Sequence, residues 1–175
     1  MPTDKTKYNY NLQPYVVSGD TTGRRDLDYY GRNLPNPLKR VIGDRRIALD
    51  LGCGNGRINS ITHTLFDKII CIDPIDELHP KFIFNNIEYR KQHLNEITDK
   101  VDVIIMIGSM HSIWRLHERG TIDFLYGMLN NDGIVCSVSD LKHEQDLSTQ
   151  SDKFERFERF MFDDNKTSLD VFKKL

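Results

Sequence analysis

A short apolar run, Ile47–Leu51, stops at three glycines placed at alternate positions. The run is typical of a buried strand, and Gly52, Gly54 and Gly56 predict a sharp turn from that strand into a helix. Residues without a Cβ also let a ligand approach the backbone closely, and the helix beyond the turn presents unpaired N–H groups. The sequence therefore predicts a ligand site at the carboxyl end of this strand.

Further short apolar runs alternate with stretches of helical spacing along the chain. The predicted strands after the first cover residues 69–72, 87–91, 101–107 and 134–138. This alternation predicts an α/β fold with a mostly parallel sheet and helices on both faces. Carboxyl ends of neighbouring parallel strands lie together, so we expect Asp73, which follows the second strand, beside the glycine turn.

Composition limits the class of protein further. The 175 residues, 38% of them hydrophobic, suit one core. Residues 1–40 are rich in tyrosine, glycine and proline without regular periodicity, which predicts an N-terminal arm or lid before a domain of residues 41–175. A net charge of -2 argues against a dedicated nucleic-acid binder. The lack of a long apolar run predicts no membrane span, and three cysteines without C-x-x-C spacing predict no metal site. We expect a cytoplasmic protein.

The spacing of the glycines distinguishes between nucleotide ligands. A dinucleotide fingerprint, G-x-G-x-x-G, would place its last glycine at position 57, where this chain has Arg57, and no phosphate-binding G-K-S/T follows. What remains is D-x-G-x-G-x-G from Asp50 to Gly56, with Asp73 following 17 residues later. In this pattern, over residues 46–140, the chain resembles the class I S-adenosylmethionine-dependent methyltransferases, whose fold is Rossmann-like.

The resemblance implies that S-adenosylmethionine is the cofactor. The motif that contains Asp50, Gly52, Gly54 and Gly56 would wrap the methionine moiety, and Asp73 would accept the two ribose hydroxyls. Two other interpretations stay open. The glycines of a Rossmann-like domain can simply form a tight turn, and the ligand can be a nucleotide sugar or NAD.

The segment after the third predicted strand departs from the family. The family often has an acid there that contacts the adenine amino group, whereas this chain has His93 at that position. The resemblance then assigns the border of the adenine to Gln92, His93 and the backbone N–H of Leu94. A simple surface position for His93 is an equally open interpretation.

The methyl acceptor is expected near Gly108–His111, after the fourth strand, with Ser109 beside the cofactor. Transfer from a sulfonium is an in-line displacement that requires alignment and, for a hydroxyl acceptor, removal of a proton. His111 is a candidate base because imidazole titrates near neutrality. Asp140, after the fifth strand, is a second candidate. The alternatives are a helix-capping or pocket-wall role for His111 and a plain loop position for Asp140.

Signatures of DNA methylation are missing from the sequence. Residues 107–110 read Ile-Gly-Ser-Met in place of the Asn/Asp-Pro-Pro-Tyr/Phe motif of adenine methylation, and no Pro-Cys motif for cytosine occurs. We therefore expect an O or N nucleophile on a small molecule, and leave a nucleic-acid acceptor and the oligomeric state open. Two rival functions use the same pocket: a non-catalytic S-adenosylmethionine-binding module, and an enzyme that cleaves this cofactor.

The end of the chain has no clear periodicity. The family usually adds an antiparallel pair of strands after the fifth strand, and only 35 residues remain after Asp140. Phenylalanines between residues 154 and 162 suggest a helix that unwinds into a strand, and Thr167–Asp170 resembles a helix start. The sequence therefore predicts a sheet with a reduced C-terminal edge.

Overall fold

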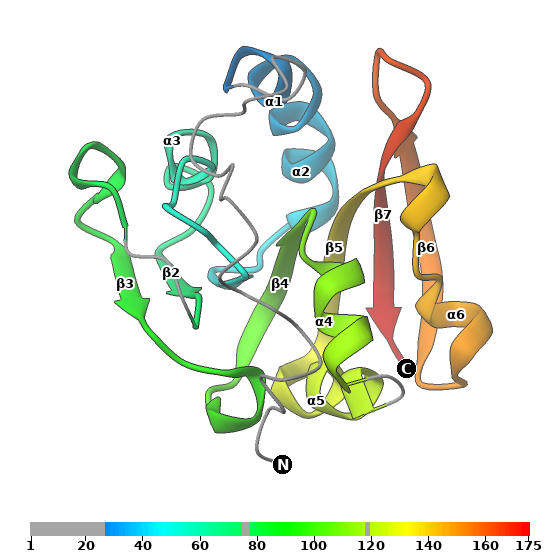
Figure 1. Cartoon of the computed structure of the whole chain (residues 1–175). Helices are drawn as coiled ribbons and strands as arrows, with labels where there is room; N and C mark the ends of the chain where they lie inside the picture. The colour runs from blue at the N-terminus through cyan, green and yellow to red at the C-terminus, as the bar shows by residue number, and fades with distance from the viewer. Residues whose placement is uncertain (1–26, 75–77, 118–119) are drawn as a thin grey trace.

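The structure, a computed structural model, describes residues 27–74, 78–117 and 120–175. Its centre is a seven-stranded sheet with the order β3-β2-β1-β4-β5-β7-β6 (Figure 1). The strands are β1 (Ile47–Leu51), β2 (Lys68–Ile72), β3 (Ile87–Arg90), β4 (Val101–Ile107), β5 (Leu129–Asp140), β6 (Phe154–Met161) and β7 (Thr167–Lys174). The helices are α1 (Leu27–Asn33), α2 (Pro35–Ile42), α3 (Asn59–Thr62), α4 (Met110–His117), α5 (Gly120–Met128) and α6 (Leu147–Gln150), with 3-10 turns η3 (Pro80–Phe82), η4 (Leu94–Glu96) and η5 (Leu141–His143).

Strands β1 to β5 are parallel, with β1 between β2 and β4. Asp50 of β1 lies in register with Cys71 of β2 and with Ile105 of β4. Strands that are covered on both faces consist of nearly continuous apolar residues, which is why the sequence shows them as short apolar runs. Their carboxyl ends meet at one edge of the sheet, so the turns that follow β1, β2, β4 and β5 gather there.

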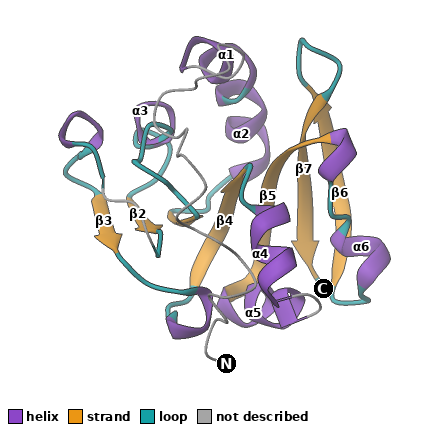
Figure 2. Cartoon of the chain, viewed as in Figure 1, coloured by secondary structure: helices purple, strands orange, loops and turns teal. Residues whose placement is uncertain are grey.

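Helices lie on both sides of the sheet (Figure 2). Apolar side chains form two buried clusters, which include residues of the strands and of these helices. Successive residues of a strand point to opposite faces, so Ala48 belongs to one cluster and Leu49 to the other. The first cluster includes Leu38 of α2, and the second includes Leu125 of α5. The predicted α/β fold, with a mostly parallel sheet between helices, is confirmed.

The C-terminal edge of the sheet is complete. β6 and β7 are eight-residue strands that pair with each other, and β7 also pairs antiparallel with β5. The predicted reduced edge is therefore wrong, and so is the helix start at Thr167–Asp170. The phenylalanines of β6 recur at every third position, which imitates helical spacing. A bulge between Arg156 and Glu158 accommodates this spacing in a strand by inserting an extra residue.

Helices α1 and α2 belong to the core of the domain. Tyr29, Tyr30, Leu34 and Leu38 are at most 5% exposed and contribute to the first apolar cluster. The part of the predicted arm from residue 27 onward therefore packs against the sheet. Residues 1 to 26 lie outside the described residues, and their role as an arm or lid stays a prediction.

The turn between β6 and β7 holds helix α1. The Tyr29 hydroxyl donates to Asp164 Oδ2 over 2.9 Å. The Asn33 side chain donates to Asp163 Oδ1 over 3.1 Å and accepts from the N–H of Asp163 over 2.9 Å. These contacts join segments about 130 positions apart, so the C-terminal hairpin fixes the place of the first described helix.

Candidate functional site

The glycine turn, residues 52–56, follows β1 at the carboxyl edge of the sheet. Gly52, Gly54 and Gly56 have φ angles of 77°, 57° and 84°, a region that residues with a side chain rarely adopt. The N–H of Gly52 donates to the carbonyl of Ile72 over 2.8 Å, which holds the turn against the end of β2. The backbone thus has the left-handed conformation that the glycine pattern predicts.

Packing within the protein requires glycine at two of these positions. A Cβ on Gly52 would lie 2.6 Å from Cβ of Ser109, and a Cβ on Gly56 would lie 2.5 Å from Cδ2 of Leu78. Both separations are far shorter than a van der Waals contact. Gly52 and Gly56 therefore let Ser109 and Leu78 pack against the turn.

We expect Gly52→Ala to destabilise the protein by about 2 kcal/mol or more, because the alanine would have both an unfavourable φ and a clash with Ser109. Gly31→Ala is the matched control. Gly31 lies inside α1 with no atom near its added Cβ, so alanine should stabilise the protein by about 0.5–1 kcal/mol. Urea unfolding measures both effects, and equal effects of the two substitutions would contradict the proposed packing.

Asp73 follows β2 and faces the glycine turn. Its Oδ2 accepts from the N–H of Gly54 over 3.1 Å, and its own N–H donates to the carbonyl of Arg90 over 3.3 Å. The residue is 6% exposed. The carboxylate is therefore fixed between the ends of β1 and β3, at the carboxyl edge of the sheet.

Asp50 is a second buried carboxyl group beside the turn. It lies in β1 and is 3% exposed. Burial raises the pKa of its carboxyl to about 7, and the charge of Asp73 adds to the shift. Asp50 is therefore partly protonated at neutral pH. A cationic ligand group beside it would favour its ionised form.

The segment after β3 contains a buried polar atom without a partner. Oε1 of Gln92 is buried and makes no hydrogen bond with the described residues. The N–H of His93 donates to Glu96 Oε2 over 2.6 Å, which closes the first turn of η4. Leu94 is 5% exposed and packs in the second apolar cluster. Of the three predicted adenine residues, Gln92 thus presents an unsatisfied acceptor.

The turn after β4 packs against the turn after β1. The Ser109 hydroxyl donates to the carbonyl of Leu51 over 2.6 Å, and the N–H of Gly108 donates to the carbonyl of Val138 in β5 over 2.8 Å. His111 is in the first turn of α4, and its side chain lies outside the described part of the structure. The structure thus brings Ser109 to the glycine turn and leaves His111 as a prediction.

Asp140 is the last residue of β5 and caps the turn that follows. Its Oδ1 accepts from the N–H of Lys142 over 3.1 Å, at the start of η5. Asp140 therefore shapes the loop after β5, and its role as a base stays a prediction.

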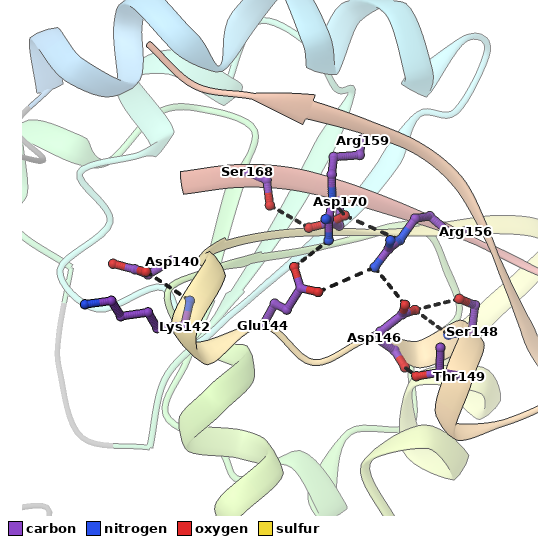
Figure 3. Close-up of polar contacts among 10 residues, drawn as sticks. All are labelled: Asp140, Lys142, Glu144, Asp146, Ser148, Thr149, Arg156, Arg159, Ser168 and Asp170. Carbon is purple, nitrogen blue, oxygen red and sulfur yellow. Dashed lines mark hydrogen bonds and ion pairs between the residues drawn. The ribbon is translucent and has the colours of Figure 1, made fainter. Parts of the chain in front are cut away.

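A group of charged side chains that the sequence did not indicate lies beyond Asp140 (Figure 3). We call it the ionic cluster, and it consists of Glu144, Asp146, Arg156, Arg159 and Asp170. Arg159 Nε lies 2.6 Å from Asp170 Oδ1, and Arg156 Nη2 lies 2.8 Å from Asp146 Oδ2. Arg159 also contacts Glu144.

The ionic cluster joins β6 and β7 to the loop that follows β5. Asp170 is 3% exposed in the middle of β7, and the Ser168 hydroxyl donates to its Oδ2 over 2.7 Å. The loop is thereby held at the carboxyl edge of the sheet. The sequence repeats Phe-Glu-Arg over residues 154–159. In a regular strand, arginines three positions apart would point to opposite faces, so the repeat does not predict the cluster without the bulge.

The described residues contain no group of three histidine, cysteine or acidic side chains arranged to hold a metal ion. In the same part of the chain, no helix is long and apolar enough to cross a membrane.

Similarity to known proteins is found in three dimensions. No family model and no curated protein sequence matches the chain. The N-methyltransferase NodS from Bradyrhizobium japonicum WM9, solved in complex with S-adenosyl-L-homocysteine, is similar with a TM-score of 0.71 and 16% identity over 96% of this chain and 98% of NodS.

Two further solved structures extend the comparison. The PH0226 protein from Pyrococcus horikoshii OT3 has a TM-score of 0.67 and 15% identity, over 92% of this chain and 98% of its own. The ribosomal protein L11 methylase from Lactobacillus delbrueckii subsp. bulgaricus has a TM-score of 0.59 and 20% identity, over 79% and 75% of the two chains. At such identities the likeness concerns the fold, and the chain has the fold of the class I S-adenosylmethionine-dependent methyltransferases.

Proposed function

We propose that the chain is an S-adenosylmethionine-dependent methyltransferase that acts on an O or N nucleophile of a small molecule. The observation that carries the proposal is the Asp73 carboxylate, bound to the N–H of Gly54 at the point where β1 and β2 end together. Three buried, unpaired cysteines suit a reducing compartment, which supports a cytoplasmic location.

The residues present fit the nucleoside part of the cofactor. Adenine has an exocyclic amino group, a donor that the buried, unpartnered Oε1 of Gln92 would satisfy. A carboxylate such as Asp73, held at the end of a strand, accepts the two hydroxyls of a ribose. The left-handed glycine turn would pass along the methionine moiety.

When bound, the cofactor supplies an electrophilic methyl group on a sulfonium. The chain has to hold the acceptor in line with that group and, for a hydroxyl acceptor, remove its proton. The turn of Gly108 and Ser109, which is fixed to β1 and β5 by hydrogen bonds, would form the wall of the acceptor site. We assign the base to His111 ahead of Asp140, because the carboxylate of Asp140 already accepts from a backbone N–H.

Calorimetric titration with S-adenosylhomocysteine tests the cofactor site. We expect the wild-type protein to bind, and Asp73→Ala to weaken binding by about 10- to 100-fold, the effect of losing hydrogen bonds to a charged group. Asp67→Ala is the control, since Asp67 is an exposed residue at the opposite end of β2. Equal affinities of wild type and Asp73→Ala would remove Asp73 from the site.

Product analysis separates the methyltransferase from the two rival functions. A methyltransferase releases S-adenosylhomocysteine only when an acceptor is added. A non-catalytic binding module binds the cofactor without releasing product, and an enzyme that cleaves the cofactor releases fragments without any acceptor. Release of S-adenosylhomocysteine that depends on a small hydroxyl or amine compound is the result that we expect.

A further inference from the structure

Asn59, the first residue of α3, is a fully buried amide side chain beside the glycine turn. Its backbone N–H donates to the carbonyl of Gly56 over 2.9 Å. A Cβ on Gly56 would lie 2.9 Å from Asn59 Nδ2, so this side chain packs directly against the end of the turn. A buried amide is costly unless it is hydrogen-bonded, so the partners of Asn59 indicate which elements it holds together.

Both polar atoms of the Asn59 side chain bind elements outside α3. Nδ2 donates to the carbonyl of Phe82 in η3 over 3.2 Å. Oδ1 accepts from the Cys71 thiol in β2 over 3.4 Å. One side chain therefore joins the start of α3 to the strand before Asp73 and to the 3-10 turn after it.

The glycine turn has two further contacts with residues that follow β2. Asp73 Oδ2 accepts from the N–H of Gly54 over 3.1 Å, and the N–H of His79 donates to the carbonyl of Asn55 over 2.9 Å. Asn59 adds a third attachment, at η3. The turn and the residues after β2 are therefore held together at three points, and only the third depends on a side chain of α3.

This third attachment controls how closely η3 packs on the turn. Leu78 Cδ2 and Phe82 Cβ lie 2.5 and 3.6 Å from the position of an added Cβ on Gly56. Because Asn59 binds the carbonyl of Phe82, its amide fixes this packing. A site that is already in its binding arrangement loses less conformational freedom on binding, and so binds its ligand more tightly.

We propose that Asn59 is a positioning residue of the cofactor site, which holds η3 against the glycine turn and so keeps the turn and Asp73 in the arrangement that binds S-adenosylmethionine. The inference rests on the proposed function. It adds a residue that acts through the turn and η3, because Asn59 is itself fully buried.

Calorimetric titration with S-adenosylhomocysteine tests this role. We expect Asn59→Ala to weaken binding by about 10-fold, because two hydrogen bonds that favour the binding arrangement are lost. Thr62→Val is the matched control. Thr62 also lies in α3 and is 1% exposed, but its hydroxyl donates to the carbonyl of Ile58, just before the helix. The control should lower the stability in urea unfolding and leave the affinity unchanged.

Asn59→Asp makes the test dependent on pH. A protonated carboxyl group has a donor and an acceptor, as the amide has, whereas an ionised carboxylate only accepts. Burial favours the protonated form of the introduced group. We therefore expect an affinity within about 2-fold of wild type at about pH 5, and an affinity about 10-fold weaker than wild type at about pH 8.

Each affinity is compared with that of wild type at the same pH. Among the described residues, the ionisable groups that contact Asn59 are the Cys71 thiol and His63, whose Nδ1 lies 2.6 Å from the Asn59 carbonyl oxygen. Both groups are present in wild type and variant, so the ratio of affinities reports on the introduced carboxyl group.

The inference alone is overturned by any of three results: Asn59→Ala binds as wild type does, Thr62→Val weakens binding equally, or the ratio for Asn59→Asp is the same at both pH values. If Asn59→Ala does not fold, the ratios for Asn59→Asp decide. A wild-type protein that does not bind S-adenosylhomocysteine overturns the proposed function and the inference together.

Discussion

Replacing Asp50 by asparagine is expected to stabilise the ligand-free protein at neutral and alkaline pH, with a gain that disappears on acidification. Burial, assisted by Asp73, raises the pKa of the Asp50 carboxyl from 3.8 to about 7. Between these values the folded chain keeps a proton that the unfolded chain has lost, so wild-type stability falls as the pH rises through this window. At about 1.36 kcal/mol per pKa unit, the full loss is on the order of 4 kcal/mol. The asparagine variant avoids this loss.

Urea unfolding of both proteins between about pH 4 and about pH 8 measures this difference. Asp102→Asn is a control with the opposite sign. Burial opposes ionisation of Asp102, but hydrogen bonds from Asn130 and from the N–H groups of Arg46 and Ile47 lower the pKa of its carboxyl. Its contribution is present above the ordinary pKa and is lost as the pH falls, so the variant should lose stability at neutral pH and regain it in acid. A gain for Asp50→Asn that is the same at every pH would contradict the assignment.

Asp170→Ala is expected to lower the free energy of unfolding by about 1.5–3 kcal/mol, the cost of losing hydrogen bonds to charged groups, because both arginines are 30% exposed and keep Asp146 and Glu144 as partners. Asp170 is 3% exposed, and its Oδ1 lies 2.6 Å from Nε of Arg159 and 3.5 Å from Nε of Arg156. Alanine leaves both cations in the sheet without this carboxylate. Urea unfolding at constant pH gives the difference.

Asp123→Ala removes a surface ion pair and serves as the comparison. Asp123 contacts Lys153 at 2.5 Å, but both side chains are largely in water, so stability should change little. If Asp170→Ala costs no more than Asp123→Ala, the ionic cluster does not support β6 and β7. A charge-swapped pair would not serve here, because Arg159 also contacts Glu144.

The parallel half of the fold could be predicted from the sequence, and the antiparallel edge could not. Strands β1, β2 and β4 are buried on both faces, so each appears as an apolar run that ends at glycine or aspartate. β6 is an edge strand with charged residues and a bulge, and its phenylalanines imitate helical spacing. β7 carries the buried Asp170, whose partner Arg159 comes from the neighbouring strand.

The candidate site divides in the same way. The position of Asp73 beside the glycine turn could be predicted, because the carboxyl ends of adjacent parallel strands meet. The packing of Ser109 and Leu78 against Gly52 and Gly56 could not be predicted, since the partners come from segments that the fold alone brings together. The lack of a hydrogen-bond partner for Oε1 of Gln92 could not be predicted either, because it depends on which groups the fold places around that atom.

The strand order has a consequence for synthesis on the ribosome. Among the described strands β6 pairs with β7 alone, and β7 follows it along the chain. A nascent chain that has emerged through β6 thus exposes an unpaired strand with Phe157 and Met161, which are 55% and 46% exposed even in the folded protein. Helix α1 also lacks the hydrogen bond from Tyr29 to Asp164 until the turn between β6 and β7 has formed. Until residues 167–174 emerge, both ends of the domain are open to mispairing with other chains.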